Sequence, residues 1–309
     1  MEKERAAQIK ELQKEKDVVI LAHYYVDGEV QEIADYVGDS FYLSKIATSV
    51  PQQTILFAGV SFMGESAKLL NPGKTVLMAD ECADCPMAHM VTKEQIAEVR
   101  GEYDDLSVVC YVNSTAEIKS VSDVCVTSSN AVKVVSNIPE KNIFFVPDNN
   151  LGRYVAAKLP EKNFIFHDGF CHVHKSIEAA NVKAAKELHP DALVLTHPEC
   201  TEDVVAMSDF VGSTSEIIDF ATASDCKKFI ICTEMGVFFE LQQKNPQKKF
   251  YSVGHRQFCP NMKRVTLEKV YDVLAGLGTE DMTDKRIELS DEIMQRAATP
   301  LWRMLELAK

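Results

Sequence analysis

VVILAHYYVDGEVQEIADYVGDS, at residues 18–40, contains the pattern from which the architecture of this chain can be predicted. It opens on a short apolar run, VVIL, in which no polar residue alternates. Unalternated runs of this length are typical of parallel strands buried on both faces. The run leads to His23, and Asp35 and Ser40 follow after twelve and five further residues. These three polar positions serve as landmarks in a search for repeats.

The same order of features occurs twice more along the chain. The second copy contains SVVCYVNST and SDVCVTSSN within residues 107–130, and the third contains ALVLTHPEC and SDFVGSTSE within residues 192–216. Steps of twelve and then five residues link Tyr111, Asp123 and Ser128 in the second copy, and His197, Asp209 and Thr214 in the third. Both copies therefore keep the spacing of the first stretch.

Three further landmarks complete each copy. A second apolar run ends seventeen residues after the serine or threonine, and a proline follows fifteen residues later. A cysteine then lies thirteen residues beyond the proline in the first and third copies and eleven residues beyond it in the second. In chain order these landmarks are Phe57, Pro72 and Cys85, then Phe145, Pro160 and Cys171, then Ile231, Pro246 and Cys259. Agreement at so many positions indicates an internal threefold repeat.

The repeat predicts the fold class. Apolar runs separated by amphipathic helical segments, such as the one with Ile96, Val99 and Tyr103, indicate parallel α/β sheets. We expect three homologous doubly wound parallel-sheet (αβα) domains around a pseudo-threefold axis, although length alone would suggest about two domains. The expected divisions are residues 1–90, 91–175 and 176–264, followed by C-terminal helices at 265–309 that pack on the first repeat.

Polar residues follow the expected strands, where the loops of parallel sheets bind ligands. Three units around one axis would bring these loops to a shared centre. The residues expected there are His23, Tyr25, Ser40, Tyr111, Asn113, Ser128, His197, Glu199 and Thr214. Equivalent positions carry different chemistry, which favours a functional site over a packing motif.

Structural roles for these residues remain open. Any single tyrosine or histidine of the set could be a satisfied, partly buried polar side chain. Ser40, Ser128 and Thr214 each precede an expected helix, so each could be an N-cap. A helix N-terminus with a hydroxyl also attracts phosphate or carboxylate, and the two roles are compatible.

Three of the nine cysteines recur with the repeat, namely Cys85, Cys171 and Cys259. Cys82 and Cys85 form C-x-x-C, which alone would suggest a redox pair or half of a zinc site. A closed zinc site commonly uses two such pairs, and this chain has one. Three thiolates from distant units better suit one 4Fe-4S cluster with an open iron that acts as a Lewis acid.

Composition excludes several classes of protein. The first sixteen residues are charged throughout and no run of about 18 apolar residues occurs, so we expect neither a secretory signal nor a membrane span. A net charge of −13 without a basic, aromatic-rich stretch argues against a nucleic-acid partner. Nine cysteines without an export signal indicate a reducing, cytoplasmic location.

Several of these motifs together resemble the quinolinate synthase family of NAD biosynthesis. In chain order they are AHYYVDGEVQEIADYVGDS, DCPMA, YVNST, VTSSNAV, THPEC, VGSTSEI and CPNMK, and the resemblance runs from about residue 17 to residue 275. The resemblance implies three α/β domains about a pseudo-threefold axis with a central active site. It implies condensation of iminoaspartate with dihydroxyacetone phosphate to quinolinate, with release of phosphate and water. It further implies a 4Fe-4S cluster on Cys85, Cys171 and Cys259, and an oxidase or dehydrogenase that supplies iminoaspartate.

The resemblance also implies roles for individual residues. Positions that correspond to substrate- and product-binding residues are His23, Ser40, Tyr111, Asn113, Ser128, His197, Ser213 and Thr214. Tyr25 and Glu199 correspond to acid–base residues, and Tyr111 is a third catalytic candidate because each step moves a proton. His174, three residues after Cys171, is a candidate supporting residue or a surface histidine.

Two rival hypotheses remain. Another open-iron hydro-lyase that acts on a different dicarboxylate would need a similar centre. A non-catalytic metal or redox sensor would use the C-x-x-C pair but would leave His23, Tyr111 and Glu199 unexplained. As a separate hypothesis, a Cys82–Cys85 disulfide would remove a cluster ligand and silence the enzyme.

Overall fold

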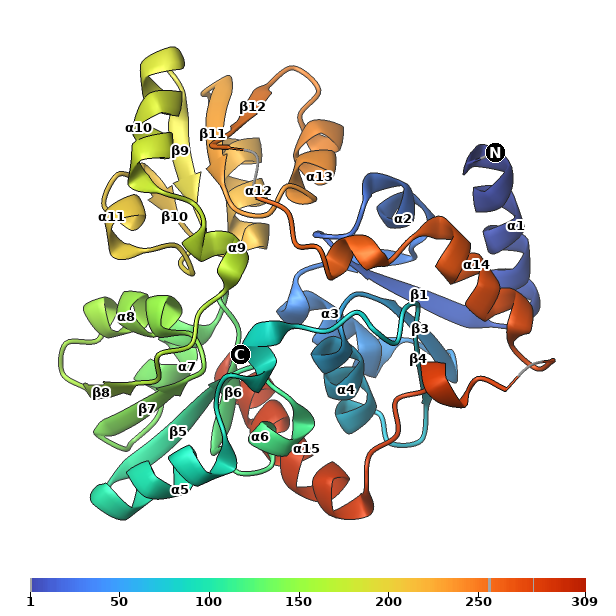
Figure 1. Ribbon diagram of the computed structural model, residues 1–309, viewed down its shortest axis with the longest axis horizontal. Coiled ribbons are helices and arrows are strands. Elements are labelled where there is room, and N and C mark those ends of the chain that lie inside the picture. The colour runs from blue at the N-terminus through green and yellow to red at the C-terminus, as the bar shows by residue number, and fades with distance from the viewer. Residues whose placement is uncertain (1, 255–256, 280) are drawn as a thin grey trace.

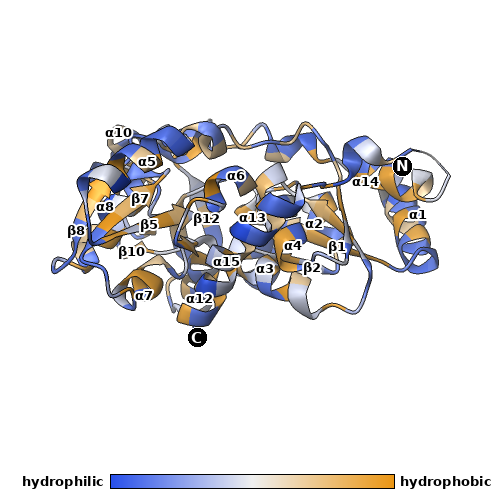
Figure 2. Ribbon diagram, turned by 90° about the horizontal axis from the view of Figure 1, so that it is seen from below, coloured by the Kyte–Doolittle hydropathy of each residue, from blue (hydrophilic) through white to orange (hydrophobic). Residues whose placement is uncertain are grey.

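The protein is described here by a computed structural model that covers residues 2–254, 257–279 and 281–309. Three α/β units surround a common centre, and the chain passes through them in order (Figure 1). Seen after a turn of 90°, the molecule is flatter, so the three units lie side by side around the centre in one layer (Figure 2).

Each unit contributes one set of helices and strands. The first contains α1 (Glu2–Glu15), β1 (Val18–His23), α2 (Gly28–Ile33), β2 (Tyr36–Gly38), α3 (Ser40–Ser49), β3 (Thr54–Ala58), α4 (Ser61–Leu70), β4 (Thr75–Met78) and the 3-10 turn η1 (Pro86–His89). The second contains α5 (Lys93–Glu102), β5 (Leu106–Tyr111), α6 (Ala116–Lys119), β6 (Val124–Val126), α7 (Ala131–Ser136), β7 (Asn142–Val146), α8 (Asn149–Lys158), β8 (Asn163–Phe166) and α9 (His172–Lys175). The third contains α10 (Ala179–Leu188), β9 (Leu193–Thr196), α11 (Glu202–Val205), β10 (Phe210–Val211), α12 (Thr214–Ala223), β11 (Lys228–Cys232), α13 (Val237–Lys244), β12 (Lys249–Ser252) and the 3-10 turn η2 (Met262–Arg264). The remaining elements are α14 (Leu267–Gly276), the 3-10 turn η3 (Thr283–Lys285) and α15 (Asp291–Leu307).

All three sheets have the same topology. Their strand orders are β2-β1-β3-β4, β6-β5-β7-β8 and β10-β9-β11-β12, and every pairing within them is parallel. The first strand of each unit is central, and the chain winds outward from it in both directions. The predicted fold class, α/β with three parallel-sheet domains, is confirmed.

The repeated aspartate has a structural role in every unit. The Oδ2 atoms of Asp35, Asp123 and Asp209 accept the backbone N–H of Ile20, Val108 and Val194, at 2.8, 2.7 and 2.8 Å. Each aspartate N–H donates in return to the carbonyl oxygen of the same strand residue. This pair of hydrogen bonds fixes the start of the second strand beside the first, so the three aspartates stabilise the sheets.

Apolar side chains from the first two units form one continuous core. Ile20, Leu56, Val109 and Phe145 are completely buried in it, and the strands in Figure 2 are mostly orange, whereas the helices carry both blue and orange. The third unit has two smaller apolar clusters of its own, one of which contains Ile230. The first two units therefore share a hydrophobic core that the third does not.

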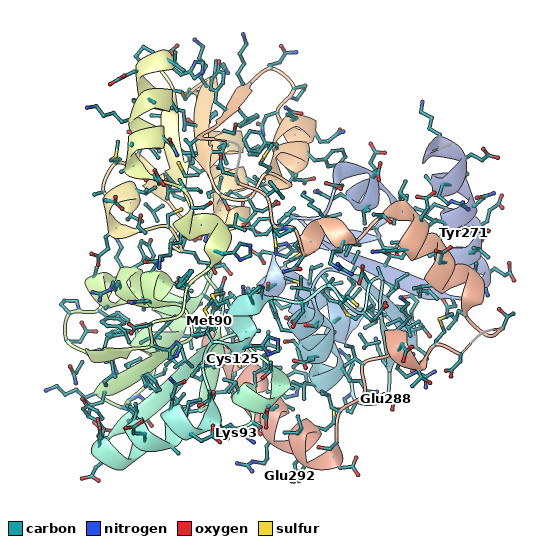
Figure 3. The ribbon with its side chains drawn as sticks, viewed as in Figure 1. Met90, Lys93, Cys125, Tyr271, Glu288 and Glu292 are labelled. Atoms are coloured by element: carbon teal, nitrogen blue, oxygen red, sulfur yellow. The ribbon has the colours of Figure 1, made fainter. Side chains whose placement is uncertain are left out.

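The C-terminal helices contact the first unit and also the second. Helix α14 packs on α1 of the first unit, and Arg5 lies 3.9 Å from the centre of the Tyr271 ring at that contact (Figure 3). Helix α15, however, packs on α4 of the first unit and also on α6 and β6 of the second (Figure 1). Its buried Ala297, Leu301 and Met304 explain why, because they complete the core that the two units share.

None of the helices within the described residues has both the length and the apolar character needed to cross a membrane.

Candidate active site

A cavity lies where the carboxyl ends of the first strands of all three sheets converge. It has an empty volume of about 660 Å³, which includes space open to solvent. Its walls contain all three repeat-related cysteines. The predicted residues that line it are His23, Tyr25, Ser40, Cys85, Tyr111, Asn113, Ser128, Cys171, His197, Glu199, Thr214 and Cys259.

The hydroxyl residues at the helix starts differ in detail from the sequence expectation. Ser40 and Thr214 are the first residues of α3 and α12, and the N-caps are the residues before them. Asp39 accepts the N–H of Tyr42, and Ser213 accepts the N–H of Glu216. Ser213 is thus a buried cap next to the cavity, whereas Ser40 and Thr214 present their side chains to it.

Two histidines at equivalent strand ends are held as neutral rings. His23 Nδ1 accepts the N–H of Tyr25 at 3.2 Å, and His197 Nδ1 accepts the N–H of Glu199 at 3.3 Å. The proton of each neutral ring is therefore on Nε2, and His197 Nε2 donates to Ser128 Oγ at 3.2 Å. Burial lowers the pKa of His23 and of His197 to about 3. Both rings are hydrogen-bond donors near neutral pH.

Glu199 is a buried carboxylate at the centre of a polar cluster. Its Oε2 lies 2.6 Å from His174 Nδ1, which is also 3.2 Å from Cys171 Sγ. Burial opposes ionisation of Glu199, but the charge and hydrogen bond of His174 outweigh it and lower the carboxyl pKa to about 2. Its Oε1 is buried without a hydrogen-bond partner in the described part of the chain, as is Asn113 Oδ1. Two unsatisfied acceptors in one cavity point to a ligand that donates hydrogen bonds.

Tyr25 and Tyr111 keep their protons at ordinary pH. The Tyr25 hydroxyl lies 2.8 Å from Thr214 Oγ1 and 3.0 Å from Thr233 Oγ1. Burial, and then the nearby charge of Glu199, raise the pKa of both phenols well above the usual value. Each tyrosine is therefore a neutral proton donor beside an ionised carboxylate.

The three cysteines fit a shared metal group. Each is half-buried, and burial followed by the charge of Cys259 raises the pKa of Cys85 to about 12. Burial and Glu199 raise the pKa of Cys171 well above that of a free thiol. No lysine or arginine is among the described residues of the cavity wall, so three thiolates there need a strongly positive group. A bound metal cluster would supply that charge.

A single-metal alternative uses Cys171, His174 and Glu199, whose ligand atoms all lie within 4.8 Å of one another. Tetrahedral zinc at about 2.1 Å from its ligands would separate those ligands by about 3.4 Å. His174 Nδ1 and Glu199 Oε2 are only 2.6 Å apart, which is a direct hydrogen bond. This set also leaves Cys85 and Cys259 without a role.

Several site residues were missed from the sequence. Thr233 Oγ1 bonds Tyr25 of the first unit and, at 2.9 Å, His174 Nε2 of the second. Glu234 and Asp39 also line the cavity. Thr233 and Glu234 follow directly after β11, so the repeat alignment could have identified them. Cys82 is exposed and lies away from the cavity wall, and its disulfide hypothesis stays a prediction.

Comparisons with known proteins agree on one family. A family model for the quinolinate synthetase A protein matches residues 7–306. A quinolinate synthase of Fusobacterium nucleatum is 55% identical over 300 residues, which is 97% of this chain and 98% of that protein. The quinolinate synthases of Caldicellulosiruptor bescii and Clostridioides difficile strain 630 are 50% and 48% identical, over 97% and 100% of both chains in each comparison. The chain is therefore an enzyme that belongs to the quinolinate synthetase A protein family of NAD biosynthesis.

Proposed function

We propose that this enzyme condenses iminoaspartate with dihydroxyacetone phosphate to form quinolinate, with release of phosphate and water. The observation that carries the proposal is the convergence, in one cavity, of three half-buried cysteines and a buried glutamate with a free oxygen. The cysteines come from three different units. This arrangement serves chemistry on a small polar substrate at a metal cluster.

The cavity suits substrates that carry several acidic groups. His23 and His197 supply N–H groups, and Ser40, Ser128 and Thr214 supply hydroxyls. Helices α3 and α12 each direct a first turn toward this region, and their free N–H groups favour carboxylate or phosphate. We assign the carboxylates and the phosphate of the two substrates to these donors.

Proton transfers are assigned to a carboxylate and two phenols. Glu199, ionised and with Oε1 free, accepts a proton from the substrate carbon or nitrogen that reacts. Tyr25 and Tyr111, protonated, donate to departing oxygen. His174, between Thr233 and Glu199, holds the carboxylate in place.

The cofactor in this proposal is one 4Fe-4S cluster held by Cys85, Cys171 and Cys259. When bound, it would supply a Lewis-acidic iron that polarises a substrate oxygen and assists its loss as water. The raised pKa values of the cavity-wall thiols support this assignment, because a bound cluster supplies the positive charge that their thiolate forms need. Such thiols persist in a reducing compartment, and we place the enzyme in the cytoplasm. An oxidase or dehydrogenase that acts on aspartate would supply the unstable imine.

The proposal is tested by anaerobic purification and analysis of iron, sulfide and zinc. We expect about four irons per chain and the electron paramagnetic resonance signal of a reduced 4Fe-4S cluster. Cys85→Ala, Cys171→Ala and Cys259→Ala should each lose it. Cys200→Ala is the matched control, since Cys200 is buried in the third unit's own apolar cluster and should keep the iron. Zinc in the purified protein, or a cluster that survives one of the three changes, would contradict the proposal.

A substrate assay separates the proposal from the hydro-lyase alternative. The loaded enzyme should form quinolinate only when both iminoaspartate and dihydroxyacetone phosphate are present. Loss of water from a single dicarboxylate, with no consumption of dihydroxyacetone phosphate, would favour the alternative.

A further inference from the structure

One backbone hydrogen bond anchors the cysteine segment in each of the three units. The donor is a backbone N–H at or shortly before the start of the helix that follows the third strand. The acceptor is the carbonyl oxygen of the residue two positions before the cysteine. The three bonds join Ser61 N to Ala83 O at 2.8 Å, Asn149 N to Gly169 O at 2.8 Å and Met235 N to Gln257 O at 2.7 Å. The three cysteine segments therefore meet their sheets in an equivalent way.

The residue before this anchor differs among the units. It is Val60 in the first, Asp148 in the second and Glu234 in the third, each three residues after the apolar landmark. The side chains of Asp148 and Glu234 are fully buried. Burying two carboxylates costs free energy unless hydrogen bonds compensate it. Their partners are therefore informative.

Each buried carboxylate accepts the backbone N–H of the cysteine in its own unit. Cys171 N donates to Asp148 Oδ2 at 3.0 Å, and Cys259 N donates to Glu234 Oε1 at 2.9 Å. The other oxygen of each accepts a second backbone N–H, from Leu151 at 2.7 Å or from Gly236 at 2.5 Å. Both carboxylates thus connect a cysteine to the start of the helix that follows the third strand.

The first unit uses a different arrangement for Cys85. With Val60 at the equivalent position, the N–H of Cys85 donates to Asp84 Oδ1 at 2.8 Å, from the neighbouring residue. The Asp84 side chain is 43% exposed and also bonds His89 and Ser61. An exposed carboxylate on the same loop restrains that loop less than a buried one from the sheet.

We infer that Asp148 and Glu234 are positioning residues that hold Cys171 and Cys259 ready to bind the cluster. The inference rests on the cluster of the proposed function. A cluster shared by three units requires three separate segments to present their sulfurs together. Hydrogen bonds to the segment that carries a ligand typically change metal affinity 10–100-fold.

Glu234 also connects this arrangement to the first unit. Lys263 Nζ lies 3.6 Å from Glu234 Oε1 and 3.1 Å from Asp27 Oδ1, and it donates to Tyr25 O at 2.9 Å. Asp148 does not line the cavity wall as described, whereas Glu234 does. Asp148 is therefore the cleaner position to change, because its effect on the cluster is separate from contact with substrate.

The test compares cluster retention in Asp148→Asn and Glu234→Gln with the parent. An amide offers one acceptor and one NH₂ to two backbone N–H groups, so one of the two bonds is lost. The proteins are loaded with iron and sulfide without oxygen and exposed to an iron chelator, while the visible absorption of the cluster is followed. We expect loss at least tenfold faster than in the parent, with an altered paramagnetic resonance signal after reduction. Asp84→Asn should have a smaller effect.

Matched controls separate positioning from general stability. Asp123→Asn and Asp209→Asn remove a similar carboxylate-to-backbone bond in the same two units, at positions far along the chain from Cys171 and Cys259. They should lose iron at the parent rate. Circular dichroism of the cluster-free proteins should show Asp148→Asn melting within a few degrees of Asp123→Asn.

Three results are decisive. Parent-like iron retention in both Asp148→Asn and Glu234→Gln overturns the inference. So does a cluster-free Asp148→Asn that is unfolded or melts far below its control, because the carboxylate would then support the whole fold. A parent that takes up no iron contradicts the proposed function instead, and this is seen before any variant is compared.

Discussion

The first two units and the third unit are joined in different ways. The first two share one apolar core, completed by α15, whereas the third has separate apolar clusters. The third unit meets its neighbours through hydrogen bonds that include Ser215 Oγ to Asp39 Oδ2 at 2.6 Å and Asn150 Nδ2 to the Glu199 carbonyl at 3.1 Å. Smaller apolar contacts also cross these junctions, since Tyr24 is buried in an apolar cluster of the third unit and Met262 of η2 belongs to the shared core.

This difference separates the scaffold from the placement of the site. Apolar burial is non-directional and makes the first two units one body. Hydrogen bonds are directional, contribute about 1 kcal/mol each, and set where the third unit places Glu199 and Thr214. The geometry of the cavity therefore depends on a few hydrogen bonds at the junctions of the third unit.

The largest effect should come from the reacting group that the third unit supplies. Glu199→Gln removes the ionised oxygen that accepts a proton, and we expect kcat to fall at least about 100-fold with the cluster retained. Steady-state assays of iron-loaded protein measure this. The control is Glu202→Gln, because Glu202 is 73% exposed on α11. Parent-like turnover in Glu199→Gln would show that Glu199 of the third unit lines the cavity without taking part in the reaction.

A second prediction tests the shared core directly. Leu301 on α15 is completely buried, and Leu301→Ala should lower the free energy of unfolding by about 2–5 kcal/mol. Hydrogen exchange should rise in the sheets of both the first and the second unit. Ile230→Ala, in a cluster of the third unit, should raise exchange in the third sheet alone. Equal responses in all three sheets to both changes would refute the division drawn above.

A third prediction concerns the closest backbone contact at the junction. A Cβ at Gly236 would lie 2.5 Å from the Tyr24 carbonyl oxygen and 2.7 Å from Tyr25 Cα. Gly236→Ala should therefore move the third unit away from Tyr25, at a cost of about 1–3 kcal/mol in stability, and should lower kcat/KM. Gly101→Ala is the control, since nothing lies within 4 Å of a Cβ there. If both variants retain full activity, the junction tolerates displacement.

The smallest effect compares equivalent histidines in the two regions. His23 and His197 have a pKa lowered to about 3 by burial, so below pH 6.5 only the unfolded chain binds protons there. Stability should fall as pH decreases from 6.5, by at most about 1.4 kcal/mol per pH unit for each histidine, and neither contributes above pH 6.5. The stabilisation by Glu199 is fully present across this range, since it is lost only as pH falls from about 4 toward 2.

Urea unfolding of the cluster-free protein between pH 7 and 5 measures this slope. His23→Asn and His197→Asn should each reduce it by a similar amount. A reduction in one variant only would show that the first and third units do not bury these rings alike.

The repeat spacing was sufficient to predict three parallel sheets, because strand length, burial and loop position all follow from a local pattern. The spacing could not assign roles to the landmarks. Asp35 and its equivalents were found only as landmarks of the repeat, and the structure shows that their carboxylates bond the neighbouring strand. Helix caps were displaced by one residue at Ser40 and Thr214, since serine, threonine and aspartate are adjacent there and all can cap.

Contacts between units were beyond the sequence. Thr233 bonds both Tyr25 and His174, and nothing in its local sequence indicates partners from two other units. Alignment of the repeats places Asp148 and Glu234 after the third strands, but it does not show that their carboxylates accept the N–H of a cysteine, and the first unit has Val60 at the same position. The contacts of helix α15 with the second unit were not predicted, because an amphipathic pattern shows that one face of a helix is buried but not which elements cover it.

The position of α15 has a consequence for how the chain folds during synthesis. Arg303 of this helix donates to the carbonyl of Asp123, 180 residues earlier in the chain, and Lys133 reaches the carbonyl of Ala308. The ribosome must therefore complete the third unit before the helix that closes the core of the first two is available. In the interval the apolar surfaces of α4, α6 and β6 that α15 covers are exposed to water. The nascent chain thus keeps an aggregation-prone apolar surface until after its third unit has been synthesised.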